Sequence, residues 1–130
     1  MDEAQADFAL NLLRSVATGD EPAVISPFSI AVALAMTYDG AQGTTKEQMT
    51  NVLAKGQSAK QFDDYVYALL SDIGKKNKSY TLDSANRLYL GEKFVLKEAY
   101  QKIIQTHYAG QLRQVDFKQV EAIVKVHNEV

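Results

Sequence analysis

The sequence contains no cysteine among its 130 residues. This absence excludes disulfide bonds, thiol nucleophiles and cysteine-ligated zinc, so stability must come from packing. An excess of basic residues is also missing, because 14 lysines and arginines stand against 16 aspartates and glutamates and leave a net charge of −2. Without a basic field to hold a phosphate backbone, we expect no nucleic-acid partner.

Long apolar runs are absent as well. The longest nearly apolar stretch, 30–36, is far shorter than the roughly 20 residues that a membrane-spanning helix needs. Near Met1 we find no basic segment followed by an apolar core and a small-residue cleavage site, so no signal peptide is visible. We therefore expect no membrane role and a cytoplasmic location.

The residues that are present have the composition of a globular domain, with 46% hydrophobic and 23% charged residues. A chain of this mass can bury about two-thirds of the surface that its unfolded form exposes. That is enough for one hydrophobic core. We expect one domain at most.

The first half of the chain is predicted to be helical. Apolar residues at helical spacing predict a surface helix over 3–17. Ser26 and Pro27 then mark a second helix start, because the serine hydroxyl can cap the helix and proline suits its first position. The body of this helix, 28–38, is apolar on nearly every side, which predicts that protein surrounds it.

Two more helices follow in this half. Thr44 and Thr45 each precede a glutamate or glutamine by three residues, a pattern that predicts capping boxes for the third helix. An apolar stripe over 62–73 predicts a fourth helix that ends at Gly74. The inner faces of these helices supply the candidate core.

In the second half, strands and helices alternate. A period of two predicts a strand over 80–90, with Ser84 and Asn86 on its apolar face. A helical stripe over 100–107, a strand over 112–117 and one more helix that begins at Val120 come next. The predicted fold class is therefore α+β.

Candidate catalytic and metal-binding groups are few. The nucleophile motif G-x-S-x-G is absent, and the two histidines, His107 and His127, lie on predicted helices. Asp63, Asp64 and Asp116 have no further ligand at the short spacings typical of metal sites. We interpret Asp63 and Asp64 as a solvated acidic face, and the sequence predicts no enzyme, no metal and no cofactor.

Two surface motifs fall in the loop after the fourth helix. Lys75, Lys76 and Lys78 could bind a polyanion, but three lysines in a turn are typical of a solubilising loop. Asn77-Lys78-Ser79 matches the N-glycosylation sequon, which we interpret as a chance match without a secretory signal.

Three polar residues are more informative: Ser26 and Ser29 at one end of an apolar helix, and Asn86 on the apolar face of a strand. Buried hydroxyl and amide groups require hydrogen-bond partners. One interpretation is a helix cap together with a satisfied core amide. The other is a buried polar cluster between helix and sheet, which would exchange partners if the strands moved.

Four motifs then occur in a fixed order along the chain. They are Ile25-Ser26-Pro27-Phe28-Ser29-Ile30, Gly40-Ala41-Gln42-Gly43-Thr44-Thr45, Ala85-Asn86-Arg87-Leu88-Tyr89-Leu90, and Tyr108-Ala109 followed by Val115-Asp116-Phe117. Together they resemble the serpin family of serine protease inhibitors, over nearly the whole chain.

The resemblance implies a partial serpin domain over 1–130. It would comprise helices A to E, strands two and one of sheet A, and the start of helix F, without the reactive-centre loop. Serpins inhibit a serine or cysteine protease when their cleaved reactive-centre loop inserts into sheet A. The resemblance also implies that Ser26, Pro27, Ser29 and Asn86 form the shutter through which the sheet opens, with no catalytic residue, no metal and no reactive centre in this chain.

Other features depart from the family pattern. His127-Asn128 only loosely matches the family's Ile-Asn pair, and everything after the start of helix F is absent. The helix that is basic in heparin-binding serpins carries Asp63, Asp64 and Asp72 here, so heparin activation is not expected. Some intracellular serpins also leave the cell, which makes the extracellular space the alternative location.

Two alternative functions stay open. The chain could be a truncated, non-inhibitory serpin-like interaction protein that pairs or swaps strands and self-associates through its sheet edges. A small helical enzyme is the third hypothesis, with only His107 and His127 behind it.

Overall fold

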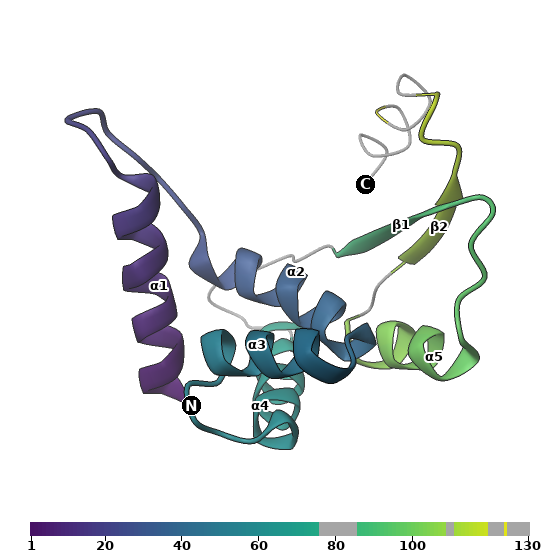
Figure 1. The fold of residues 1–130 in the computed structure, drawn as a ribbon, viewed down its shortest axis with the longest axis horizontal. Helices are drawn as coiled ribbons and strands as arrows, with labels where there is room; N and C mark the ends of the chain where they lie inside the picture. The colour runs from purple at the N-terminus through teal and green to yellow at the C-terminus, as the bar shows by residue number, and fades with distance from the viewer. Residues whose placement is uncertain (76–85, 109–110, 120–123, 125–130) are drawn as a thin grey trace. The chain divides into compact units, whose positions relative to one another are not determined.

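The computed structural model describes residues 1–75, 86–108, 111–119 and 124 (Figure 1). The chain divides into two compact units, Met1–Leu69 and Leu70–Val130, which we describe separately and call the first and second units. No helix within the described residues is both long and apolar enough to span a membrane.

The first unit is helical, as the sequence predicts. Its helices are α1 (Asp2–Val16), α2 (Pro27–Gly40), α3 (Gly43–Leu53) and most of α4 (Ala59–Ile73). Figure 1 shows α1 beside α2 and α3, and the two neighbours contact α1 directly. The predicted helices over 3–17 and 62–73 and the helix start at Ser26-Pro27 are confirmed.

The predicted capping boxes at Thr44 and Thr45 are wrong. Helix α3 begins earlier, at Gly43, and its N-cap is Gln42, whose side chain makes no capping hydrogen bond. Gly43 has a φ of +55°, a left-handed conformation that glycine adopts without steric cost. The chain therefore enters the helix before the threonines, which lie in its first turn instead of capping it.

The core of the first unit lies where α2 meets α1, α3 and α4. Its fully buried large side chains are Tyr38 of α2, Leu53 of α3 and Phe62 of α4. The rings of Tyr38 and Phe62 pack edge to face, with centroids 5.2 Å apart. Such aromatic pairs contribute about 0.5–1.5 kcal/mol beyond the burial of their area.

Side-chain hydrogen bonds join the helices around this core. Gln5 Nε2 of α1 donates to the Leu53 carbonyl oxygen at 2.8 Å. The hydroxyl groups of Tyr38 and Thr50 are 2.9 Å apart, and Thr50 also donates to the Lys46 carbonyl oxygen at 2.7 Å. These bonds hold α1 and α2 against α3.

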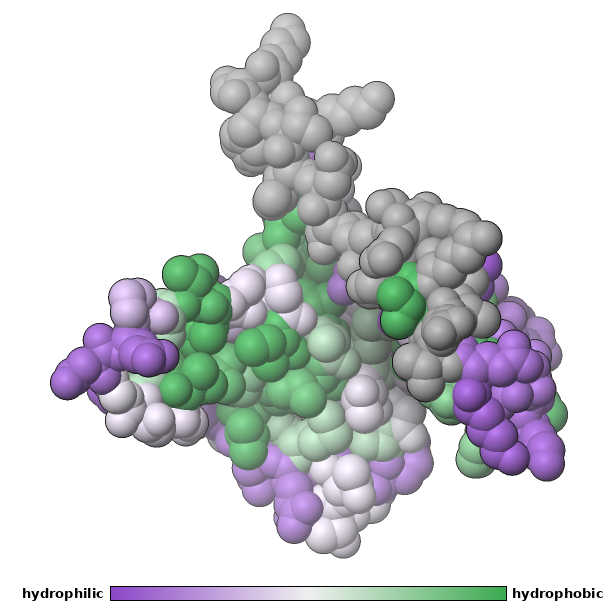
Figure 2. Space-filling view, turned by 90° about the horizontal axis from the view of Figure 1, so that it is seen from above, coloured by the Kyte–Doolittle hydropathy of each residue, from purple (hydrophilic) through white to green (hydrophobic). Residues whose placement is uncertain are grey.

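Helix α2 is buried on one face only. Ala31, Val32, Ala35, Met36 and Tyr38 are buried, but Ile30 is 38% exposed. Among the described residues only one face of this helix is covered, so the expectation that protein surrounds it stays a prediction for the longer protein. Leu10, Leu13 and Val16 of α1 are exposed too, and Figure 2 shows hydrophobic residues gathered on the face that it displays.

The second unit contains a β-α-β arrangement: β1 (Arg87–Gly91), α5 (Glu98–His107) and β2 (Gln111–Val115). The strands pair in parallel, with Arg87 opposite Gln111 and Gly91 opposite Val115. Parallel neighbours need a crossover connection, which α5 supplies. Ile104 and Tyr108 are buried.

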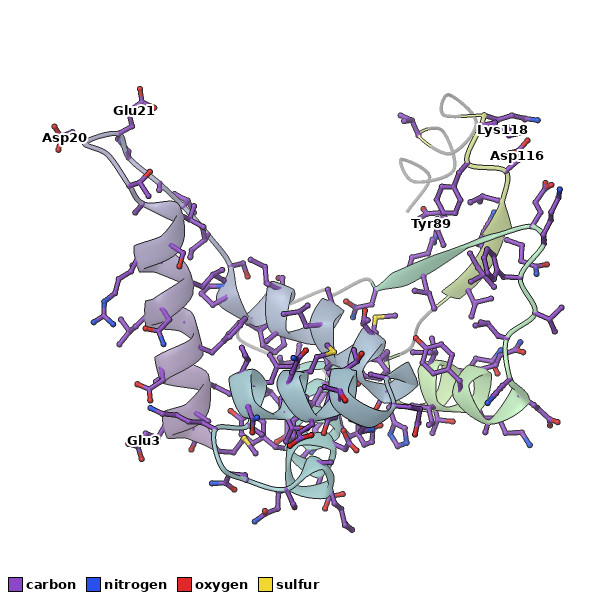
Figure 3. The ribbon with its side chains drawn as sticks, viewed as in Figure 1. Glu3, Asp20, Glu21, Tyr89, Asp116 and Lys118 are labelled. Atoms are coloured by element: carbon purple, nitrogen blue, oxygen red, sulfur yellow. The ribbon has the colours of Figure 1, made fainter. Side chains whose placement is uncertain are left out.

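The sequence predicted these elements with small errors at their ends. The strand over 80–90 is confirmed from Arg87 onward, but 80–85, including Ser84, lie outside the described residues. The strand over 112–117 ends at Val115, and Phe117 lies in the turn that follows. Figure 3 shows Asp116 and Lys118 at this turn, where the Lys118 N–H donates to Asp116 Oδ1 at 3.0 Å.

Candidate functional site

The N-terminus of α2 carries three of the four predicted shutter residues. Ser26 is the N-cap, and its Oγ accepts a hydrogen bond from the Ser29 N–H at 3.4 Å. Pro27 occupies the first position of the helix, where its missing N–H leaves no intrahelical bond unmade. The Ser26 carbonyl oxygen accepts the first helical hydrogen bond, from the Ile30 N–H at 3.2 Å.

The hydroxyl groups of Ser26 and Ser29 bond to each other, with 2.9 Å between their Oγ atoms. Both residues are exposed. The expectation that they are buried is therefore wrong for this chain, because they lie on the exposed end of a helix of which only one face is buried. The pair is already satisfied, so either hydroxyl could exchange its partner at low cost.

Asn86 lies directly before β1 and is half-buried. It belongs to the second unit, whereas the serines belong to the first, and each unit is described by itself. The structure thus brings Ser26, Pro27 and Ser29 together, and the role of the four residues as a shutter stays a prediction.

The strand pair forms a second candidate site. Within the described part of the chain, β1 and β2 form a two-stranded sheet. The Glu92 N–H donates to the Val115 carbonyl oxygen at 3.2 Å, which extends the pairing past Gly91. A free edge exposes N–H and C=O groups that can bond to an added strand.

One face of this pair borders a cavity of about 270 Å³. Gln114 of β2 spans the connection before α5, because its Nε2 donates to the Phe94 carbonyl oxygen at 2.9 Å. Phe94 and Val95 themselves are 68% and 93% exposed. The lining residues of the cavity are Leu90, Val95, Leu96, Gln101, Leu112 and Gln114.

A polar cluster between α2, α3 and α4 was not expected from the sequence. The hydroxyl of Tyr67 on α4 lies 3.1 and 3.0 Å from the two carboxylate oxygens of Asp39 on α2 and donates to them. Asp63 lies on α4 one turn before Tyr67 and is half-buried. Lys46 Nζ of α3 lies 4.4 Å from the centre of the Tyr38 ring.

Burial and the Asp39 charge together raise the pKa of Asp63 from 3.8 to about 6, and burial makes the larger contribution. Burial likewise raises the pKa of Tyr38. The predicted acidic face is therefore right for Asp64, which is exposed and pairs with Lys60, and wrong for Asp63, which is half-buried. Helical spacing could have indicated that Asp63 is half-buried, because Asp63 lies one turn before Val66 and Tyr67 on α4.

Among the residues with a described placement, the remaining candidates form no further site. No group of three metal-ligating side chains occurs within the residues that the structure describes. His107 is the last residue of α5 and is half-buried, while His127 lies outside the described residues. Lys75 pairs with Asp72 at 2.5 Å. The other lysines of the loop and the Asn77-Lys78-Ser79 sequon are outside the described residues as well.

Comparison with known proteins covers nearly the entire chain. A family model described as serpin (serine protease inhibitor) matches residues 3–130. Serpin B6 from Pongo abelii is 32% identical over 131 residues, which include 98% of this chain and 34% of that protein. The chain spans about a quarter to a third of the length of the curated relatives that it matches.

Comparison with solved structures also matches this chain to serpins. The thermophilic serpin tengpin in its latent state matches 98% of this chain and 34% of its own, with a TM-score of 0.85 and 27% identity. Cleaved kallistatin complexed with heparin matches 97% of this chain and 38% of its own, with a TM-score of 0.84. At 21% identity, the second likeness shows the fold alone.

Proposed function

Since this chain belongs to the serpin family, we propose that the protein containing it inhibits a serine or cysteine protease by inserting a cleaved reactive-centre loop into sheet A. The observation that supports this proposal best is the parallel pair β1–β2, which the resemblance to serpins over residues 3–130 implies to be strands of sheet A. Strand addition to a sheet satisfies backbone N–H and C=O groups and can release stored strain.

In this proposal the residues of the chain act on conformation and not on a substrate bond. Ser26 and Ser29 would hold the start of α2, and Asn86 would hold the start of β1. Movement of the strands would exchange the hydrogen-bond partners of these three side chains. Pro27 would keep the helix start fixed while the sheet opens, because its ring locks its own φ.

The test requires the full reading frame that contains this sequence. We expect the purified full-length protein to form a covalent complex with a trypsin-like, chymotrypsin-like or papain-like protease that survives denaturing electrophoresis. The 130-residue chain alone, which includes no reactive-centre loop, should trap none of them. Cleavage of the full-length protein by all three classes without any stable complex would contradict the proposal.

A second candidate function is a truncated, non-inhibitory interaction protein. It is favoured by the small size of the described two-stranded sheet together with exposed apolar side chains such as Phe94 and Val95 near β1. Size-exclusion chromatography of the 130-residue chain distinguishes this candidate. Stable, defined oligomers support it, whereas a monodisperse monomer contradicts it.

We propose that heparin does not activate this protein. Kallistatin, a structural neighbour, is complexed with heparin. In this chain, however, Lys60 pairs with Asp64 and Lys75 pairs with Asp72, so carboxylates neutralise both lysines. An unchanged rate of protease inhibition on addition of heparin is the expected result, and an increase of tenfold or more would overturn it.

A further inference from the structure

The turns that follow β1 and β2 meet at one end of the strand pair, in the second unit. Gly91 ends β1 and Val115 ends β2, and the two residues are partners in the parallel register. The turn after β1 is closed by a hydrogen bond from the Phe94 N–H to the Gly91 carbonyl oxygen at 2.9 Å. In the turn after β2, Asp116 Oδ1 accepts from the Lys118 N–H (Figure 3). In open parallel sheets, ligands bind outside these carboxyl ends of the strands.

Two phenyl rings converge on Gly91 at this end. A Cβ atom at Gly91 would lie 3.3 Å from Cδ2 of Phe94 and 3.8 Å from Cδ2 of Phe117. Both rings are nevertheless open to solvent, since Phe94 is 68% and Phe117 is 57% exposed. Because glycine has no side chain, the rings can approach the backbone closely and still present much of their surface to a ligand.

A cavity of about 350 Å³ lies between the two turns and includes both rings in its lining. Its volume is within the range of small-molecule sites. Four charged side chains also line it, and we call them the charged rim: Glu92, Lys93, Asp116 and Lys118. Within the described residues, none of the four takes part in an ion pair. The rim therefore keeps two cations and two anions that a ligand can pair with.

The chemistry of the lining determines which ligand fits. Aromatic rings pair favourably with another ring in offset or edge-to-face arrangements. Lysine ammonium groups donate to a carboxylate, and carboxylates accept from an ammonium group. A molecule of one charge sign would meet two like charges on the rim. A ring that carries both a cation and an anion pairs with every kind of group in the cavity.

We propose that this cavity binds a small zwitterion with an aromatic ring, of which an aromatic amino acid is the simplest example. The ring packs against Phe94 and Phe117. The carboxylate of the ligand accepts from the lysines of the charged rim, and its ammonium group donates to the acidic side chains. The proposal does not depend on protease inhibition, because none of these residues belongs to the predicted shutter.

Ligand-detected NMR titration of the full-length protein tests the proposal with four probes. L-Tryptophan carries the ring and both charges, tryptamine lacks the carboxylate, indole-3-propionate lacks the ammonium group, and L-leucine lacks the aromatic ring. We expect tryptophan to bind several-fold more tightly than each of the other three. Equal binding of all four probes would overturn the proposal. So would the absence of tryptophan binding, the result expected if the rest of the full-length protein covers the two rings.

Variants of the full-length protein locate the binding site. Phe117→Leu keeps an apolar side chain but removes one ring, and it should weaken tryptophan binding several-fold. The double variant Lys93→Met/Lys118→Met should weaken the binding of tryptophan and indole-3-propionate but not that of tryptamine. Lys102→Met changes an exposed lysine of α5 outside the cavity and should leave all four affinities unchanged. Tryptophan binding of wild-type strength in the double variant would overturn the proposal, even if Phe117→Leu folds poorly.

Discussion

In their described residues, the two units of this chain differ in how many apolar side chains they bury. Among the twelve buried apolar residues of the described part of the chain, ten belong to the first unit and two, Ile104 and Tyr108, to the second. In the first unit, helices that are close in sequence cover one another. In the second unit, each strand has a single partner among the described residues.

Within the described residues, the helices of the first unit form a core of their own, whereas the two strands of the second unit do not. Two strands rarely make a stable sheet by themselves, because their faces and edges need further strands or helices. Substitutions in the first unit should therefore act mainly on stability, and substitutions near β1 should act on how the sheet assembles. Paired variants in the full-length protein can break or sharpen this contrast.

The largest expected effect is that of Phe62→Ala. Phe62 is fully buried and packs edge to face on Tyr38, so its truncation should cost about 3–5 kcal/mol of unfolding free energy. Val95→Ala in the second unit removes a 93% exposed side chain and should change stability by less than about 0.5 kcal/mol. Urea unfolding of the two variants measures the difference, and comparable losses would break the contrast.

Asn86→Ala should have the next largest effect. If the Asn86 amide bonds to the strands that complete sheet A in the full-length protein, its loss should leave those partners unsatisfied at a cost of about 1–3 kcal/mol. If Asn86 belongs to a shutter, this variant should also form polymers on mild heating faster than the wild type. Val66→Ala, in the core of the first unit, serves as an equally destabilised control. Equal polymerisation of the two variants would reject the shutter role of Asn86.

A smaller loss is expected for Ser26→Ala. The substitution removes the N-cap hydroxyl of α2 and should lower stability by about 1 kcal/mol. Ser26→Asp keeps a capping oxygen and should restore most of that loss. Thermal unfolding compares the variants. If only the cap matters, Ser26→Asp should also restore the wild-type rate of polymer formation, whereas a shutter hydroxyl should not be replaced by a carboxylate.

The smallest effects are expected for two exposed ion pairs, one in each half of the chain. Lys60 pairs with Asp64 on α4, and Lys102 pairs with Glu98 on α5, both across four residues. Each pair should contribute about 0.3–0.5 kcal/mol. Asp64→Ala and Glu98→Ala should therefore shift the unfolding midpoint slightly and equally in low salt. A loss of more than 1 kcal/mol of unfolding free energy in either variant would show that its ion pair is less exposed to solvent than the structure indicates.

Local sequence signals predicted much of this fold. Ser26-Pro27 marked the start of α2 because capping and the proline φ act within a few residues. The period-two pattern likewise placed β1. The start of α3 was missed because both the left-handed Gly43 and the threonines that follow it are suited to a helix N-terminus. Composition does not show at which of these residues the helix begins.

Contacts distant in sequence were harder to predict. Tyr67 and Asp39 are 28 residues apart, and nothing in either segment indicates the other. Asp63 looked solvated because it adjoins Asp64 in sequence, whereas packing of α4 against α2 decides that only one of the two is half-buried. The exposure of Ser26 and Ser29 was missed for the same reason, because an apolar helix does not indicate which of its faces is covered.

The bond between Tyr38 and Thr50 has a fixed direction. A threonine hydroxyl carries one hydrogen, and Thr50 uses it to donate to the Lys46 carbonyl oxygen at 2.7 Å. The oxygen of Thr50 can therefore only accept from Tyr38, which must supply the hydrogen of the 2.9 Å bond. Donation thus runs one way, from the phenol through the threonine to the backbone, and it sets the orientation of the ring that meets Phe62 at an angle of 84°.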